Sequence, residues 1–275
     1  METTVKPYFL FPSDPFDPRA IDTEFADQAN ALQDDGFSCA VWQPETNRIR
    51  FSQLRPINGE KAVVYRGWML KEPEYNQLVQ AVEAHDAKLI TDTDTYLLAH
   101  HIPAWYPMIS DLTAETVIFP NGTYNLDELP ALLKQLGWEK YFVKDYVKSL
   151  KTAGGSVLSN LSDLPELIDN MLRYRGEIEG GLCIRKFEEF VPGTEKRFFC
   201  LNGIVYHAAS DNFGIVVDTM YHPLAAKVRL PSRFYSIDIA LRTDGQARVV
   251  EVGDGQVSDL VGWKPEEFAG MWVGQ

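Results

Sequence analysis

Two acidic residues on neighbouring apolar segments are the most informative feature of the sequence. Asp238 lies in the strand-like run 235–240, Glu251 lies in the run 247–252, and a turn at 243–245 joins the two runs. A hairpin of this kind places side chains of adjacent strands next to each other. Because an unpaired charge is costly to bury, each carboxylate must have a basic partner, or both must share a cation such as Mg²⁺, which prefers oxygen ligands.

The alternative to a shared cation is a pair of structural salt bridges. In that arrangement Asp238 pairs with Arg233 or Arg242, and Glu251 pairs with Arg248. Two carboxylates that bind Mg²⁺ together with substrate phosphates are common chemistry, so the pair by itself does not decide between the two arrangements.

A pair of lysines and a glycine loop lie upstream. Lys144 lies within the apolar run 140–146, Lys148 follows it, and Gly154 and Gly155 come a few residues later. Glycines let backbone N–H groups approach a polyphosphate, and lysine neutralises its charge. The spacing matches neither GxxxxGK[ST] nor GxGxxG, so an edge-strand lysine before an ordinary turn is the alternative.

An acidic, proline-interrupted segment runs from 184 to 197. A strand that leads into such a segment can leave backbone groups free for the edge of an adenine ring, and Glu195 could bind ribose hydroxyls. The alternative is a solvated loop whose salt bridges contribute little. Arg66, at the end of the expected strand 62–68, is either a ligand contact or a surface arginine.

In this order, the segments resemble the ATP-grasp superfamily, and their wording resembles the clade named for two arginines and one lysine. The resemblance is carried by VKDYVKSLKTAGGS (143–156), IRKFEEFVPGTEKRFF (184–199), SIDIA (236–240) and VVEVGDGQVSDL (249–260), and an N-terminal VVYRGWML (63–70) fits the same clade. The likeness is dense from residue 140 to 262 and thinner before it.

The resemblance implies a role for each matching residue. Phosphate contacts fall to Lys144 and Lys148, the mobile phosphate loop to Gly154 and Gly155, the adenine hinge to Glu188, Glu189 and Val191, ribose binding to Glu195, and the metal to Asp238 and Glu251. Arg185 and Arg197 fall near the phosphates or the second substrate and, with Lys148, are the implied catalytic residues. The superfamily usually has Asn two residues after the second ligand, where this chain has Gly253, so Asp254 is the candidate third metal ligand.

The elements that must position these residues divide the chain into two parts. Alternating strands and helices up to about residue 112 predict a small parallel α/β domain, and the pattern breaks around Pro103 to Pro107. Residues 113–275 predict an ATP-grasp fold of two α+β lobes, about 113–186 and 187–275, that hold ATP between them. The expected fold class is therefore α/β plus α+β, with a pre-ATP-grasp-like domain at 1–112.

The composition and net charge of the chain limit the kinds of partner that it could bind. The 275 residues include 45% hydrophobic residues and carry a net charge of −13, which argues against a nucleic-acid partner. The three cysteines form no CxxC pair, and neither a membrane span nor a signal peptide is apparent, so we expect a soluble cytoplasmic protein. The five histidines show no metal-ligand spacing, and His100 and His101 are interpreted as a helix C-terminal feature.

The resemblance implies a ligase that uses ATP and Mg²⁺, with Mn²⁺ as an alternative metal. The enzyme would convert a carboxylate to an acylphosphate, which an amine, a thiol or a similar nucleophile would attack, releasing ADP and phosphate. Two other functions stay open: a phosphotransferase that acts on a hydroxyl, and a non-catalytic ATP-binding module. The carboxylate, the nucleophile and the oligomeric state are left undetermined by the sequence.

Overall fold

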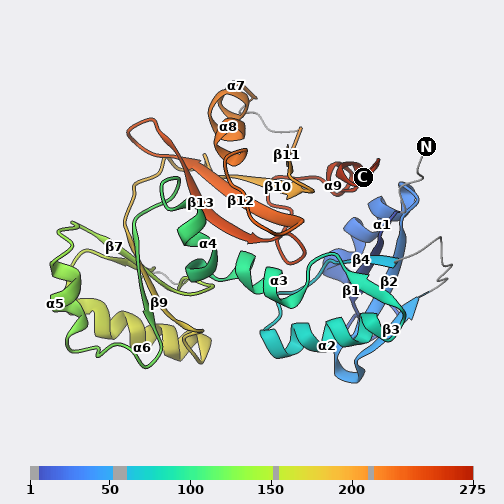
Figure 1. The fold of residues 1–275 in the computed structure, drawn as a ribbon, viewed down its shortest axis with the longest axis horizontal. Coiled ribbons are helices and arrows are strands. Elements are labelled where there is room, and N and C mark those ends of the chain that lie inside the picture. The colour runs from blue at the N-terminus through green and yellow to red at the C-terminus, as the bar shows by residue number, and fades with distance from the viewer. Residues whose placement is uncertain (1–5, 52–60, 151–154, 210–213, 275) are drawn as a thin grey trace.

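The computed structural model describes residues 6–51, 61–150, 155–209 and 214–274. Within these ranges the chain forms an N-terminal sheet, a small sheet and a large sheet, and helices α3 (Thr93–His100) and α4 (Ile102–Ile109) run between the first and the other two (Figure 1). The mixed α/β content expected from the sequence is confirmed.

The N-terminal sheet has the order β3-β2-β1-β4-β5, parallel except for the edge strand β3. Its central strand is buried along its whole length, which explains why Tyr8 to Phe11 read as a continuous apolar run. The strands are β1 (Tyr8–Pro12), β2 (Ser38–Gln43), β3 (Arg48–Phe51), β4 (Lys61–Tyr65) and β5 (Ala87–Leu89), and the helices are η1 (Thr23–Phe25), α1 (Ala26–Asp34), η2 (Pro44–Thr46) and α2 (Glu72–Glu83).

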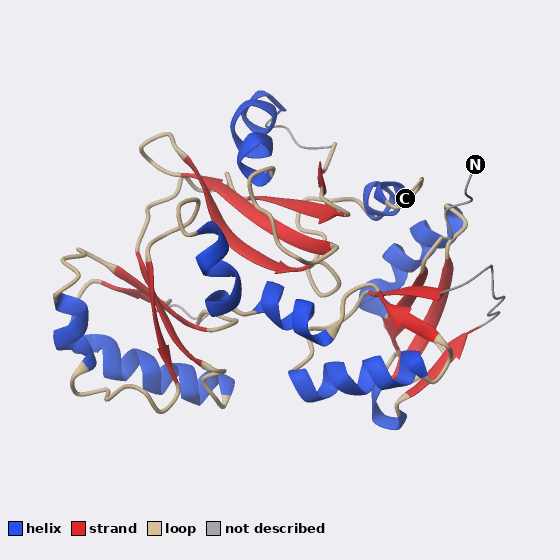
Figure 2. Ribbon diagram, viewed as in Figure 1, coloured by secondary structure: helices blue, strands red, loops and turns tan. Residues whose placement is uncertain are grey.

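The small sheet is antiparallel, with the order β6-β9-β7-β8, and Figure 2 shows helices on one of its faces. The longest of these helices, α6 (Leu164–Arg175), carries a proline in its first turn and ends at Gly176, whose positive φ of 81° suits glycine. The other elements are β6 (Thr116–Pro120), α5 (Leu129–Lys134), β7 (Tyr141–Asp145), β8 (Val157–Leu158), η3 (Leu161–Asp163) and β9 (Gly181–Lys186).

The large sheet is antiparallel, with the order β11-β10-β12-β13. The predicted hairpin is confirmed as its two longest strands, β12 (Phe234–Leu241) and β13 (Ala247–Asp254). The remaining elements are β10 (Lys196–Leu201), β11 (Ile204–His207), α7 (Gly214–Val216), the π-helix η4 (Val217–Tyr221), α8 (His222–Ala225) and α9 (Pro265–Met271).

Residues 103–107, where the alternation of strands and helices was expected to break, lie in helix α4, which follows α3 with no strand between them. Pro103 occupies the first turn, where its missing N–H leaves no bond unmade, and Pro107 removes only the bond to the Pro103 carbonyl. Burial of Ile102, Trp105 and Ile109 holds the helix together despite this loss.

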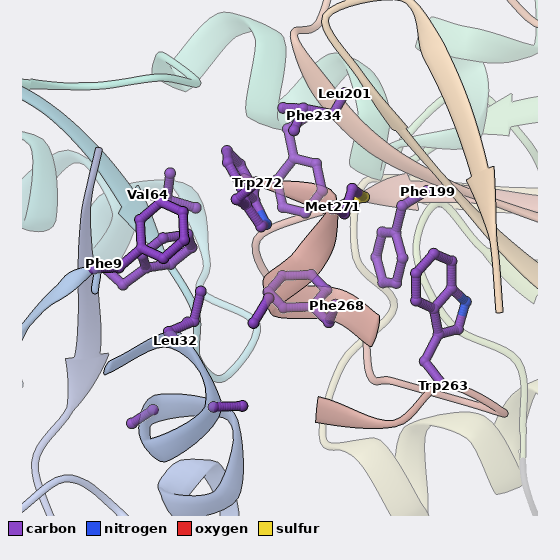
Figure 3. Close-up of a cluster of buried hydrophobic side chains, with 14 of the residues drawn as sticks. Phe9, Leu32, Val64, Phe199, Leu201, Phe234, Trp263, Phe268, Met271 and Trp272 are labelled. Atoms are coloured by element: carbon purple, nitrogen blue, oxygen red, sulfur yellow. The ribbon is translucent and has the colours of Figure 1, made fainter. Parts of the chain in front are cut away.

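A buried hydrophobic cluster joins the two ends of the chain. Phe9 and Leu32 of the N-terminal part contribute to the same cluster as Phe234 of the large sheet and Phe268 and Trp272 near the C-terminus (Figure 3). The Trp272 ring lies edge-on to Phe9 at 5.1 Å and to Phe234 at 4.9 Å between ring centroids. The C-terminal helix therefore packs between the two parts, and the boundary at residue 112 stays a prediction.

Among the described residues, no helix combines the length and the apolar character that crossing a bilayer requires.

Candidate active site

Asp238 and Glu251 lie directly opposite each other on β12 and β13, as the sequence predicts. A β-bulge follows immediately, because the register shifts between Asp238 and Ile239. Bulges re-aim side chains and are common beside functional sites. Both carboxylates line a cavity of about 590 Å³, a size usual for small-molecule sites.

Each carboxylate has a cationic partner from a different strand. Arg197 lies opposite Asp238 in the β10–β12 register, and its guanidinium donates from Nε to Oδ1 at 2.8 Å and from Nη2 to Oδ2 at 2.6 Å. Lys144 Nζ on β7 donates to Glu251 Oε1 at 2.6 Å. The lysine contact bridges the small and large sheets, so the carboxylate pair joins the two lobes.

These partners are not the ones that the structural alternative requires. Arg242 and Arg248 both donate to Glu188, at 3.4 and 3.1 Å, and Arg233 donates to Asn202 at 3.1 Å. The basic residues nearest in sequence are therefore engaged elsewhere. Asp238 and Glu251 instead contact the two cations that the resemblance assigns to a nucleotide site.

The two carboxylates differ in their electrostatic surroundings. Burial raises the pKa of Asp238, an effect that the bidentate Arg197 opposes. Burial also tends to raise the pKa of Glu251, but the Lys144 ammonium outweighs it, and the net pKa lies below its usual value. Glu251 is thus held ionised by its partner, with 43% of its side chain exposed.

Cations from several elements face this cavity. Lys144 and Lys148 line it, as do Arg175 at the end of α6 and Arg197 on β10. The Lys148 side chain is exposed, whereas Lys144 is buried. A site this rich in cations, on a protein of net charge −13, is suited to an anionic ligand such as a polyphosphate.

Asp145, which the sequence analysis does not single out, organises the turn that carries Lys148. It is fully buried, and its Oδ1 accepts hydrogen bonds from the N–H groups of Val147 at 2.8 Å and Lys148 at 2.6 Å. Its Oδ2 accepts from Glu179 N at 3.1 Å and pairs with Arg175 at 2.6 Å. The signal was an Asp at the end of a strand, a residue type that often bonds to backbone N–H groups in a following turn.

The glycine loop is only partly described. Gly154 lies outside the described residues. Gly155 has a φ of +62°, which suits glycine, but it is not among the residues that line the cavity. Its assignment to the phosphate loop stays a prediction.

The four residues assigned to the adenine hinge and ribose also lie away from this cavity. Glu188 is engaged by Arg242 and Arg248, and Glu189 O accepts from Thr243 N at 3.0 Å. Val191 N donates to Leu241 O at 2.8 Å. This backbone donor is therefore occupied by β12 and not free for adenine. Glu195 is likewise not part of the cavity lining.

Arg185 is brought close to the pair without lining the cavity. Its Nη1 donates to Val250 O at 2.8 Å and its Nη2 to Thr113 Oγ1 at 2.6 Å. Burial lowers the pKa of its guanidinium, and its Nε has no partner within the described part of the chain. Arg185 thus ties β9 to the strand that carries Glu251.

Asp254 lies away from the other two candidate metal ligands. It is fully buried, pairs in register with Tyr235, and does not line the cavity. Its Oδ1 accepts from Gln256 N at 2.9 Å, while Oδ2 has no partner among the residues described. Strand alternation explains the placement, because Asp254 is three residues from Glu251 and the two side chains point to opposite faces.

His100 was interpreted only as a helix-end residue, and it does end α3, but it also lines the cavity. Its ring stacks on Tyr96 at 5.1 Å between centroids. Burial lowers the pKa of His100 to about 4, so its ring is neutral at pH 7. Sequence spacing could not reveal this, because contact with β13 arises only in the fold.

The donor set fits a hard divalent cation in part. Asp238 and Glu251 offer carboxylate oxygens from facing positions on one cavity wall, as a Mg²⁺ site that also uses substrate phosphates requires. Among the described residues there is no group of three or more His, Cys, Asp or Glu side chains that could hold a metal by themselves. A metal here would therefore need oxygens from the nucleotide.

Residues 135–271 match a family described as an ATP-grasp domain, family 3 of the clade named for two arginines and one lysine. No curated protein sequence matches the chain significantly. Solved structures that share the fold include an ATP-grasp RimK domain protein from Sphaerobacter thermophilus DSM 20745, with 15% identity, a TM-score of 0.62, and coverage of 98% of this chain and 100% of that chain.

Two further structures with this fold are, by name, a synthetase and a ligase. D-cycloserine synthetase DcsG is 15% identical, with a TM-score of 0.60 and coverage of 96% of this chain and 97% of that chain. ATP-grasp ligase PsnB, solved with a phosphomimetic variant of its minimal precursor, Mg and ADP, is 10% identical, with a TM-score of 0.57 and coverage of 98% of this chain and 99% of that chain.

Proposed function

Because this chain belongs to the ATP-grasp superfamily, within the clade named for two arginines and one lysine, we propose that it is an ATP- and Mg²⁺-dependent ligase that joins a carboxylate to an amine or a similar nucleophile. The observation that carries the proposal is the facing pair Asp238 and Glu251, held by Arg197 and Lys144 on the wall of a cation-rich cavity. The ligases that share the fold support it.

The reaction proceeds in two displacements. A carboxylate oxygen of the substrate forms a bond to the γ-phosphorus of ATP while the bond to the ADP oxygen breaks, which yields an acylphosphate. The nucleophile then attacks the acyl carbon, phosphate leaves with the bonding electron pair, and the nucleophile loses its proton. Both steps concentrate negative charge on phosphoryl oxygens, so fixed cations lower the barrier.

The residues of this chain supply position and charge. Lys144 and Lys148 contact the phosphates, and Arg197, placed by Asp238, faces the transferred group. A bound Mg²⁺, or Mn²⁺ in its place, would be held by Asp238 and Glu251 and would neutralise charge on the phosphates. For that, Glu251 exchanges its contact with Lys144, and the lysine turns to the nucleotide.

The other assigned residues complete the proposal outside this cavity. Glu188, Glu189 and Val191 border adenine, Val191 through its side chain because its N–H is bonded to Leu241 O. Glu195 holds ribose, with Gly154 and Gly155 over the phosphates. Arg185 supports β13 beside Glu251. We further propose a cytoplasmic location, where ATP is available and the three free cysteines stay reduced.

Hydroxylamine trapping tests the reaction class. A mixed pool of amino acids, small acids and peptides is offered with ATP, Mg²⁺ and hydroxylamine, which captures an acylphosphate as a hydroxamate. A ligase releases ADP and forms hydroxamate in step, and Glu251→Gln abolishes both. Glu115→Gln is the matched control, because Glu115 pairs with Lys186 on the surface.

A stable phosphoester without hydroxamate would identify a phosphotransferase and reject the ligase. Nucleotide binding with neither product, across the whole pool, would favour a non-catalytic ATP-binding module.

A further inference from the structure

Arg66 is an arginine of the N-terminal part that is buried against the C-terminal part. It directly follows β4 and is 1% exposed. Its Nη1 donates to Gly255 O, its Nη2 donates to Ser258 O at 3.0 Å, and the guanidinium also contacts Gln28 Oε1 at 2.9 Å. Neither sequence expectation for Arg66, a ligand contact or a surface residue, describes this placement.

Neighbouring backbone groups reinforce the contact between β4 and the segment 255–258. Tyr65 N donates to Gln256 Oε1 at 3.1 Å, and Gly67 N donates to Gln256 O at 3.2 Å. Hydrogen bonds from the residues on both sides of Arg66 therefore hold the segment 255–258 against the end of β4.

The segment 255–258 continues into residues that line the candidate site. Val257, Ser258 and Asp259 line the cavity. The Asp259 carbonyl accepts a hydrogen bond from Arg197 Nη1 at 3.0 Å, and Arg197 in turn pairs with Asp238. An unbroken path of hydrogen bonds and chain thus runs from Arg66 to the carboxylate pair.

The cost of burying Arg66 indicates that its role is to position the segment 255–258 and not to stabilise the fold. Its hydrogen-bond acceptors are neutral oxygens, and burial lowers the pKa of Arg66 to about 10. Burial is the largest effect on this guanidinium, and the nearby carboxylates of Asp259 and Asp254 offset only part of its cost. The guanidinium also overlies the Phe268 ring at 4.6 Å, a contact that an apolar side chain could replace. An apolar residue cannot donate hydrogen bonds, whereas one planar guanidinium donates to two separate carbonyls.

We infer that Arg66 is a positioning residue for the nucleotide site: by holding the carbonyls of Gly255 and Ser258, it sets the segment that aligns Arg197 with Asp238. This inference rests on the proposed function. It makes the N-terminal part a structural component of the ATP site.

The test compares Arg66→Met and Arg66→Lys with Arg48→Met, a matched change at an exposed arginine of the same sheet. Hydrogen exchange reports the segment 255–259 without reference to activity. We expect roughly tenfold faster exchange there in Arg66→Met, with unchanged exchange in β1 and β2. Arg66→Lys, which can reach one carbonyl at a time, is intermediate and keeps the test valid if Arg66→Met does not fold.

Ligand affinity distinguishes positioning from a merely structural role. Mg-ATP affinity falls roughly tenfold in Arg66→Met, as for supporting residues of metal sites, while adenosine affinity stays unchanged and Lys partly rescues. Unchanged exchange at 255–259, or equal losses for both ligands, would overturn the inference. If the wild-type protein binds no Mg-ATP, the proposed function is rejected. If Arg66→Lys still speeds exchange at 255–259 in that case, the link between Arg66 and the segment remains supported.

Discussion

At the scale of single residues, Asp238 and Glu251 carry equal formal charge in unequal surroundings. The Asp238 side chain is 7% exposed and accepts from Nε and Nη2 of one arginine, whereas the Glu251 side chain is 43% exposed and contacts a lysine through one oxygen. Neutralising either one removes charge from the proposed cation site and weakens an ion pair, and Asp238 is the more buried of the two carboxylates.

Asp238→Asn and Glu251→Gln should both abolish Mg²⁺-dependent ATP turnover, measured as ADP release. Urea unfolding should show that Asp238→Asn lowers the free energy of unfolding by about 1–3 kcal/mol, because a buried charge-assisted bond weakens. The loss for Glu251→Gln should be smaller, since the site is partly solvated. Turnover at the wild-type rate in both variants would place the metal site elsewhere.

Asp254 predicts a pH dependence of stability. Burial raises its pKa from 3.8 to about 7, so between these values the folded state binds a proton that the unfolded state has released. Stability contributed by this group is therefore present below pH 4 and is lost as pH rises to 7, by at most about 1.4 kcal/mol per pH unit. Asp254→Asn should remove this fall, so its advantage over wild type in urea unfolding grows from pH 4 to 7. A constant difference across that range would contradict the shifted pKa.

At the scale of elements, the turn after β7 depends on Asp145. The carboxylate holds the backbone of Val147 and Lys148 and anchors Arg175 of α6. One side chain therefore sets the position of the exposed lysine and one of the cavity's arginines.

Asp145→Ala should lower the free energy of unfolding by about 3–5 kcal/mol, because it leaves Arg175 without its buried partner. Mg-ATP affinity, measured by calorimetry, should fall as well, since Lys148 is no longer held. Asp145→Asn keeps the acceptor for the turn and should lose less. Asp169→Ala, an exposed residue on α6, is the control. Equal stability of Asp145→Ala and the control would show that the turn holds itself.

At the scale of the whole molecule, the cluster around Trp272 joins the N-terminal sheet to the large sheet (Figure 3). A shared core of this kind makes independent unfolding of its parts unfavourable. The N-terminal and C-terminal parts of the chain therefore need not be stable when separated from each other.

Trp272→Ala should cost about 3–5 kcal/mol, the usual loss for truncating a buried large aromatic side chain. Unfolding of the wild type should be a single transition by both fluorescence and circular dichroism. Val273→Ala, at the exposed neighbour, should be nearly neutral. Two separate wild-type transitions would instead support independent domains at 1–112 and 113–275.

The sequence by itself determined what depends on local pattern. The two apolar runs and the short turn predicted the hairpin that places Asp238 and Glu251 on neighbouring strands. The β-bulge between Asp238 and Ile239 then shifts the register by one residue and makes the two residues direct partners. The strand position of Lys144 and the superfamily likewise followed from segment order. The apolar runs 140–146, 235–240 and 247–252 also matched β7, β12 and β13 to within a few residues.

Only the tertiary structure decided the partners. Lys144 and Glu251 are 107 residues apart in sequence, and Arg66 lies 189 residues from the Gly255 carbonyl it holds. No local pattern encodes such contacts, because they depend on how whole sheets pack. The same packing brought His100 to the cavity. Residue types therefore indicated which chemical groups the site contains, whereas contacts between distant elements decided how those groups are placed relative to one another.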